Sequence, residues 1–230
     1  MAENQSAEEV LERYKEILGE EFGILFYTLH NEYTWLVAKW QQFQMLYETN
    51  PERIEIMNKT APFFFRVVQF TIWESIVLQI ARLIDPPQSV GKNNLTIKRL
   101  PIYIDNEPKK KALELLIEIA ESSTSFARDW RNRHIAHRDL NLATNIPVTK
   151  LAEANKQITE SALKSLSDVL GFIHREYFNT QFLYELGSYL GDAESVLVLL
   201  RDGWEADQQR RDRINSGKAI ESDYESYRAL

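Results

Sequence analysis

The residues best suited to chemistry lie in one short stretch, Arg131–His137, with the sequence Arg-Asn-Arg-His-Ile-Ala-His. Two of the four histidines in the chain, His134 and His137, stand there among arginines. A histidine can accept and donate protons near neutral pH because its unperturbed pKa is about 6.5. An arginine guanidinium offers donors in a fixed fork that suits a phosphate or a carboxylate. The stretch therefore indicates acid–base chemistry on an anion, or else an ordinary helix end whose cations favour the negative pole of the helix dipole.

The reaction that this stretch can support without a metal ion is cleavage of an RNA phosphodiester. A histidine takes the proton of a ribose 2′-hydroxyl or gives one to the leaving 5′-oxygen, and an arginine stabilises the charged phosphorane. General acid–base help of this kind accelerates a reaction about a hundred- to ten-thousand-fold. Because RNA brings its own nucleophile, no serine or cysteine is needed.

The spacing within the stretch leaves more than one pairing open. Residues three or four apart share a helix face, which places Arg133 beside His137 and Arg131 beside His134. Arg131 and His137 are six residues apart and lie about 120° from each other around an ideal helix. They converge only if the helix unwinds near His137 or if two chains meet.

Composition excludes several other kinds of site. The chain has no cysteine, which excludes disulfide scaffolds and thiolate metal sites. Two histidines at a three-residue step without a carboxylate cluster make a poor zinc site. The eight glycines are scattered and form no phosphate-binding loop or nucleophile elbow. We therefore expect neither a metal nor another cofactor.

The net charge of −7 is unevenly distributed along the chain. Residues 1–55 carry 11 acidic and 4 basic residues, whereas residues 92–111 and 128–138 are locally basic. A local basic face can bind nucleic acid with a strong salt dependence, and solvated helix faces are the alternative for the lysines of 92–111. The chain starts without a secretory pattern, and its longest apolar runs fall short of the roughly 20 residues that span a bilayer. We expect a soluble, cytoplasmic protein with no membrane partner.

The elements that must position the stretch are predicted to be helices. Apolar residues recur at three- and four-residue steps in most segments, and the fractions of hydrophobic (44%) and aromatic (11%) residues are typical of a packed globular protein. The pattern predicts an all-α antiparallel helical bundle over residues 1–185, with a C-terminal helix and polar tail over 186–230. Local signals predict a capping box at Ser6, interruptions at Gly19 and Gly23, a cap and first turn at Thr60 and Pro62, a helix start at Thr149 and a cap at Asp192.

Arg131-Asn132 followed by His137, in an all-helical chain, resembles the hallmark of the HEPN superfamily: an Arg, often followed by Asn or Asp, then four to six residues and a His. The wider string from Trp130 to Asp139, with the upstream Ala-Arg-Leu-Ile-Asp-Pro of residues 81–86, looks most like the abortive-infection U-type branch associated with phage defence. The resemblance covers about residues 20–180.

This resemblance implies an HEPN-like bundle and a metal-independent endoribonuclease of toxin or phage-defence type that leaves a 2′,3′-cyclic phosphate. It also implies a homodimer whose two motifs face one cleft, with RNA as substrate and a protein antitoxin as a candidate partner. Arg131 would stabilise the phosphate, Asn132 would position it and His137 would be the acid–base group. The alternative site residues are Arg133, His134 and Asp139, and the accessory residues are Arg82 and Asp85.

Other functions and roles remain open at this level. A catalytically inactive HEPN-like bundle would bind RNA, a nucleotide or a protein partner through the same groove, and a scaffold would act only through its oligomer. Some HEPN toxins carry a Tyr two residues after the His, where a partner enzyme modifies them; Asp139 stands at that position here, so this control is not implied. His30 is expected to be a core or edge histidine. His174, which has no matching partner nearby in the sequence, is expected to be structural.

Overall fold

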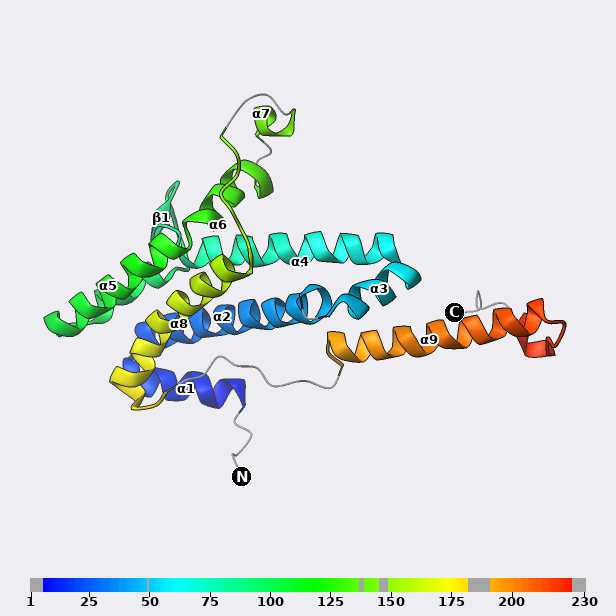
Figure 1. Cartoon of the computed structure of the whole chain (residues 1–230). Helices are drawn as coiled ribbons and strands as arrows, with labels where there is room; N and C mark the ends of the chain where they lie inside the picture. Colours follow the sequence, from blue (N-terminus) through cyan, green and yellow to red (C-terminus); the bar gives the residue numbers. More distant parts are fainter. Residues whose placement is uncertain (1–5, 49, 137–138, 145–148, 182–190, 225–230) are drawn as a thin grey trace. The chain divides into compact units, whose positions relative to one another are not determined.

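The fold is almost entirely helical (Figure 1). The structure, a computed structural model, describes residues 6–48, 50–136, 139–144, 149–181 and 191–224. The predicted all-α helical bundle is confirmed, and a two-stranded hairpin is the only sheet in the described part of the chain. The chain forms two compact units: unit 1 comprises residues 1–40 and 72–186, and unit 2 comprises residues 41–71 and 187–230. The predicted boundary between residues 185 and 186 lies outside the described residues.

Unit 1 holds most of the helices and all the predicted site residues. Helices α2 and α4 run through both units. The elements of unit 1 are α1 (Ala7–Leu18), the first part of α2 (Glu20–Tyr47), the last part of α4 (Pro62–Leu83), the antiparallel hairpin β1 (Gln88–Ser89) and β2 (Lys92–Asn93), the 3-10 helix η1 (Ile97–Tyr103), α5 (Glu107–Ser123), α6 (Ser125–Trp130), the π-helix η2 (Arg131–Ile135), α7 (Leu140–Ala143) and α8 (Lys156–Phe178).

The first two helices form a tight turn at the glycines noted in the sequence. Ser6 and Glu9 make the predicted reciprocal capping box at the start of α1. Gly19 ends α1 with φ of +88°, a left-handed conformation that favours glycine. A Cβ at Gly23 would stand 2.6 Å from the Cα of Lys15. Gly23 therefore allows the backbones of α1 and α2 to touch.

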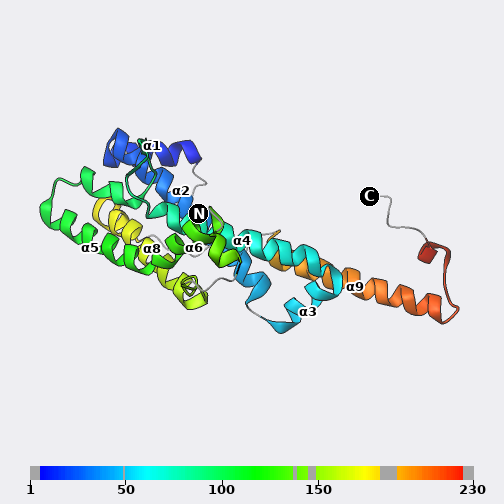
Figure 2. The ribbon, with the colours of Figure 1, turned by 90° about the horizontal axis from the view of Figure 1, so that it is seen from above.

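The core of unit 1 is formed by the apolar faces of four helices. Helix α5 packs along α8, and the two lie side by side in Figures 1 and 2. The Tyr33 hydroxyl of α2 donates to the carbonyl oxygen of Leu163 in α8 at 2.7 Å. Burying a single large apolar side chain in this core stabilises the fold by about 1.5–3 kcal/mol. Fully buried members of this core are Phe26, Leu29, Ile76, Ile80, Leu113, Leu166 and Leu170.

Two histidines that are distant in sequence meet inside this core. The ring nitrogens His174 Nε2 and His30 Nδ1 are 3.5 Å apart, among aromatic rings that include Tyr14 and Phe26. Burial lowers the pKa of both His30 and His174 to about 4, and for His174 the neighbouring His30 adds to the effect. Both rings are therefore neutral at physiological pH. The buried position of His174 agrees with the expected structural role, and its partner His30 is distant in the sequence because α2 and α8 bring the two rings together.

Unit 2 is built around helix α9 (Ala193–Asn215). Asp192 caps α9 as predicted, and the helix packs against α3 (Pro51–Thr60). The second part of α2, the first part of α4 and η3 (Glu221–Tyr224) complete the unit. Pro62 begins α4 as predicted, but Thr60 is no cap, because its hydroxyl donates back to the carbonyl oxygen of Ile56 at 2.8 Å.

Helix α4 is long and apolar enough to cross a membrane by length and composition alone, with 28% of the relevant window buried. A criterion based on uninterrupted apolar runs overlooks it, because polar residues such as Arg66 and Gln69 interrupt the runs. A core helix of a globular protein passes the same test, so the finding is weak support for a membrane span.

Candidate active site

The predicted catalytic stretch begins where a regular helix widens. Helix α6 continues into η2, and the amide of Ala136 donates to the carbonyl oxygen of Arg131, five residues earlier, at 2.8 Å. Such π-turns are rare in proteins, and many of those that occur lie at functional sites. The angular positions of an ideal helix therefore do not apply after Arg131. His137 and Arg138 lie outside the described residues, so the relation between Arg131 and His137 stays a prediction.

Arg131 is held by one of the two predicted accessory residues. Its Nη1 donates to Oδ1 of Asp85, just beyond α4, at 2.7 Å. The Asp85 side chain is 12% exposed and that of Arg131 is 33% exposed. The remaining guanidinium donors of Arg131 have no partner in the described part of the chain. Arg131 is thus oriented by one bond while its other donors stay free for an anion.

Arg133, in contrast, is engaged in hydrogen bonds with two other parts of the chain. Its Nη1 lies 3.2 Å from Oδ1 of Asp129, and its Nη2 donates to the carbonyl oxygen of Thr149. The other Asp129 oxygen accepts from the amide of Ala152 at 2.8 Å. These contacts hold residues 149–152, which form no helix, and α8 begins only at Lys156, after the cap Asn155. The predicted helix start at Thr149 was wrong for this reason.

The first histidine of the stretch, His134, faces helix α4. His134 Nε2 lies 3.6 Å from Oε1 of Glu74, and its ring packs edge-on against Trp130 with centroids 5.4 Å apart. The indole nitrogen of Trp130 donates to the carbonyl oxygen of Ala152 at 2.8 Å. Trp130 therefore helps to hold residues 149–152 in place. His134 remains an alternative base that has a carboxylate within reach.

The two remaining polar candidates have different surroundings. Asn132 is exposed and makes no side-chain hydrogen bond within the described residues. Asp139 accepts from the amide of Leu142 at 3.0 Å and caps α7. The geometry gives Asp139 a structural contact and leaves Asn132 free to meet a ligand.

Arg131 opens onto a cleft of about 450 Å³ within unit 1. The cleft brings together the end of α4, the hairpin, α2 and η2. Arg82, the other predicted accessory residue, also lies in its wall. The lining residues are Glu32, Arg82, Leu83, Asp85, Asn93, Asn94, Leu95 and Arg131.

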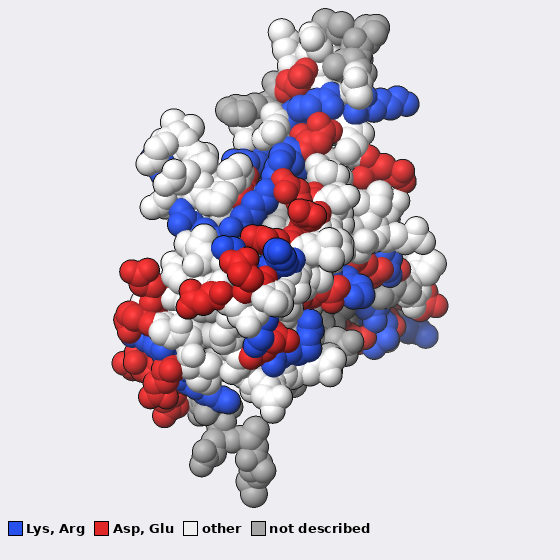
Figure 3. Space-filling view, turned by 90° about the vertical axis from the view of Figure 1, so that its left-hand side faces the viewer, with Lys and Arg blue, Asp and Glu red and all other residues white. Residues whose placement is uncertain are grey.

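The basic stretch 92–111 is partly engaged in structure. Lys98 pairs with Glu121 at 2.6 Å, and Lys109 pairs with Glu176 at 3.0 Å. Figure 3 shows basic and acidic side chains interspersed over one face. Within the described residues, no group of three His, Asp or Glu side chains could hold a metal ion.

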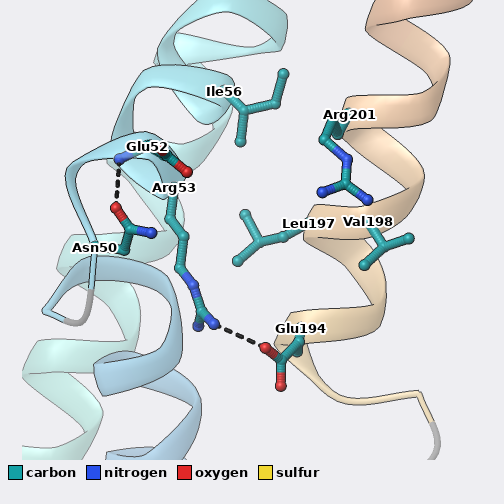
Figure 4. A pocket seen from close by; sticks show the side chains of 8 residues that line it. All are labelled: Asn50, Glu52, Arg53, Ile56, Glu194, Leu197, Val198 and Arg201. Carbon is teal, nitrogen blue, oxygen red and sulfur yellow. Dashed lines mark hydrogen bonds and ion pairs between the residues drawn. The ribbon is translucent and has the colours of Figure 1, made fainter.

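A second hollow lies in unit 2, between α3 and α9 (Figure 4). Its volume is about 240 Å³, and an ion pair of 2.8 Å between Arg53 and Glu194 crosses it. Arg201 and Glu52 also line it, so its charges balance. None of the predicted site residues lies there.

Comparison with known proteins identifies the family. The model of the HEPN_AbiU2 family, described as AbiU2, matches residues 19–196. The chain belongs to this AbiU2 family. The match spans the cleft, η2 and every residue predicted for the site. Comparison with curated proteins and with solved structures yields no match.

Sequence reasoning missed part of the AbiU2 cleft. Glu32, Asn93 and Asn94 line it beside Arg131, although they lie far from Arg131 in the sequence. No local motif marks them, because Glu32 lies within a long helix and Asn93 and Asn94 lie in a polar hairpin. Only the packing of α2 and the hairpin against the end of α4 reveals their role.

Proposed function

We propose that this AbiU2-family protein is a metal-independent endoribonuclease of phage-defence or toxin type that acts in the cytoplasm. One observation carries the proposal: the Arg131 guanidinium, held by the nearly buried Asp85, lines a cleft, and its other donors have no partner among the described residues. A guanidinium with free, oriented donors suits a phosphodiester. Family membership adds a nuclease- or defence-related context.

In the proposed reaction the RNA supplies the nucleophile. The 2′-oxygen attacks phosphorus as a base removes its proton, so an O2′–P bond forms and the P–O5′ bond breaks. The leaving 5′-oxygen takes up a proton, which gives a 2′,3′-cyclic phosphate and a 5′-hydroxyl. His137 moves these protons, Arg131 stabilises the phosphorane charge and Asn132 positions the phosphate.

The proposed active form is a homodimer in which two motifs face one cleft. Arg131 and His137 are six residues apart in the sequence, and a second copy offers a simple way to bring the arginine of one motif to the histidine of the other. A nuclease of this kind also needs restraint in its host, and a protein antitoxin is the proposed partner. Mixing inactive Arg131→Met and His137→Ala chains would restore activity if the site is shared between copies.

The decisive experiment is incubation of the purified chain with total tRNA and a folded mRNA in EDTA. Wild type should cut RNA, and the new 5′ ends should accept phosphate from a kinase without prior phosphatase treatment. His137→Ala should lose at least about a hundredfold in rate, the lower end of acid–base catalysis. His134→Ala is the matched control and should retain activity.

Two results would contradict the proposal. The absence of cleavage on every RNA, with binding retained, would favour the catalytically inactive HEPN-like bundle. Cleavage that survives His137→Ala but not His134→Ala would move the acid–base role to His134.

A further inference from the structure

The cleft beside Arg131 contains more than an anion site. Its wall combines two guanidiniums, Arg82 and Arg131, with the carboxylate of Glu32. A site built only for phosphate would not place a carboxylate there, because like charges repel. The Glu32 carboxylate instead suits a ligand group that donates hydrogen bonds.

Glu32 is held in a defined orientation by a buried glutamine. Gln79, only 6% exposed, donates from Nε2 to Oε2 of Glu32 at 2.9 Å and to its carbonyl oxygen at 2.8 Å. Lys39 donates to Oε1 of Gln79 at 2.7 Å. Because that oxygen faces an ammonium group, the Nε2 of Gln79 must face Glu32. Oε1 of Glu32 has no partner among the described residues and remains an oriented acceptor.

Arg82 supplies a cation at the same cleft. Its side chain is exposed and makes no hydrogen bond or ion pair with the described part of the chain. Burial lowers the pKa of Lys39, the nearby Glu32 raises it, and Arg82 lowers it further. Arg82, Lys39 and Glu32 therefore lie within electrostatic range of one another. An anion bound at Arg82 would lie close to the Glu32 acceptor.

The hairpin closes the other side of the cleft. Arg99 anchors it, donating to the carbonyl oxygens of Asn94 at 2.8 Å and Pro87 at 2.7 Å. Asn93 accepts from Gln88 at 3.1 Å, which leaves its amide nitrogen without a partner among the described residues. Leu95, 37% exposed, adds an apolar surface. The cleft thus offers an apolar wall, a free amide, an acceptor and two cations.

We propose that this cleft binds a guanine nucleotide of the RNA strand, with Glu32 accepting from the guanine N1–H and N2–H groups and Arg82 holding its phosphate. The identity of the ligand as RNA rests on the proposed function. The cleft volume of about 450 Å³ lies in the usual range for small-ligand sites. Guanine is the base that presents two adjacent donors on its Watson–Crick edge, which matches an ionised carboxylate. Splayed bases of single-stranded RNA are commonly read on that edge.

The test measures binding and not cleavage. Fluorescent tetranucleotides with 2′-O-methyl riboses cannot be cut, because they lack the nucleophile. Five are compared: one of four uridines, and four in which guanosine, inosine, adenosine or cytidine replaces the second uridine. Free 5′-GMP is a competitor. Fluorescence anisotropy with the full chain in EDTA should show guanosine bound about tenfold more tightly than uridine, the scale of one good base contact. Inosine, which lacks the N2 amino group, should fall between them.

Variants separate the base contact from the phosphate contact. Glu32→Gln should reduce the guanosine preference to within about twofold, while Glu118→Gln, an exposed residue of α5, should keep it. Arg82→Gln should weaken every tetranucleotide by a similar factor and leave the preference intact. Arg175→Gln, exposed on α8, is its matched control.

Equal affinity for all five tetranucleotides, or a preference that survives Glu32→Gln, would overturn the inference. Binding of 5′-GMP as tight as that of the guanosine tetranucleotide would overturn the RNA assignment in favour of a free nucleotide. The proposed nuclease fails separately: selective binding without cleavage would contradict it and leave the guanine site standing.

Discussion

Nη1 of Arg131 donates a hydrogen bond to Oδ1 of Asp85 at 2.7 Å, across 46 residues of sequence. The contact joins the π-helix η2 to the second residue after the end of α4. It fixes one end of the guanidinium of Arg131, a residue that lines the cleft. Asp85 thereby acts as a positioning residue for Arg131.

The Arg131–Asp85 pair should couple measurably in a double-mutant cycle. We expect an interaction energy of about 1–2 kcal/mol from urea unfolding of the single and double alanine variants. Arg131→Ala should cost more than Asp85→Ala, because it leaves a nearly buried carboxylate unpaired. The exposed pair Lys164–Asp168 is the control and should couple by less than about 0.5 kcal/mol. Equal coupling of the two pairs would contradict this expectation.

Arg133→Gln should lower the stability of the protein more than its RNA-cleaving activity. Its guanidinium bonds to Asp129 and to the carbonyl oxygens of residues 149 and 150, so its loss should lower the free energy of unfolding by about 1–3 kcal/mol. Hydrogen exchange at the amide of Ala152 should also speed up. Arg175→Gln should change neither quantity. If Arg133→Gln instead abolishes RNA cleavage in a stable protein, Arg133 and not Arg131 serves the phosphate.

The buried histidine pair should make the protein acid-sensitive. The pKa of His30 and of His174 is lowered to about 4 in the folded chain, against about 6.5 when unfolded. Unfolding therefore takes up protons below pH 6.5, so this stability is complete above that pH and is lost as pH falls toward 4. Each histidine adds at most about 1.4 kcal/mol per pH unit in that window. Urea unfolding between pH 7 and pH 4 measures the slope.

Neutral replacements provide the control for the histidine pair. His174→Gln should flatten the slope in part, and the double variant with His30→Gln should flatten it further. A double variant whose stability falls with pH as steeply as wild type would show that other groups are responsible.

Gly23→Ala should be destabilising although alanine is the better helix former. The new Cβ would stand 2.6–2.7 Å from the backbone of residues 14 and 15, so α1 and α2 must separate. We expect a loss of about 2 kcal/mol or more in thermal or urea unfolding. Gly203→Ala in α9 meets nothing within 4 Å and should instead stabilise by about 0.5–1 kcal/mol. A neutral Gly23→Ala would mean that the close contact is absent in solution.

Local sequence signals predicted the helices well where one residue type has one strong preference. Helices start after Ser6 and Asp192 because a side-chain oxygen of each accepts from a free backbone amide of the first turn. Helix α4 starts at Pro62 because proline has no amide that would lack a partner there. The predicted helix start at Thr149 was wrong because the carbonyl oxygen of Thr149 accepts a hydrogen bond from Arg133, 16 residues away in the sequence. The predicted cap at Thr60 was wrong because its hydroxyl donates to the carbonyl oxygen of Ile56 in the preceding turn and, within the described residues, accepts from no amide of α4.

The sequence by itself determined the all-α class, the family resemblance and the cationic stretch from Arg131, since these depend on periodicity and on residues close together in the chain. Only the tertiary structure decided which of these cations are engaged by other side chains. It commits Arg133 to Asp129, pairs Arg131 with Asp85 and brings Glu32 and Arg82 to one cleft. The physical reason is that side-chain availability depends on partners from other helices, and helix packing, not local sequence, brings those partners within hydrogen-bonding distance.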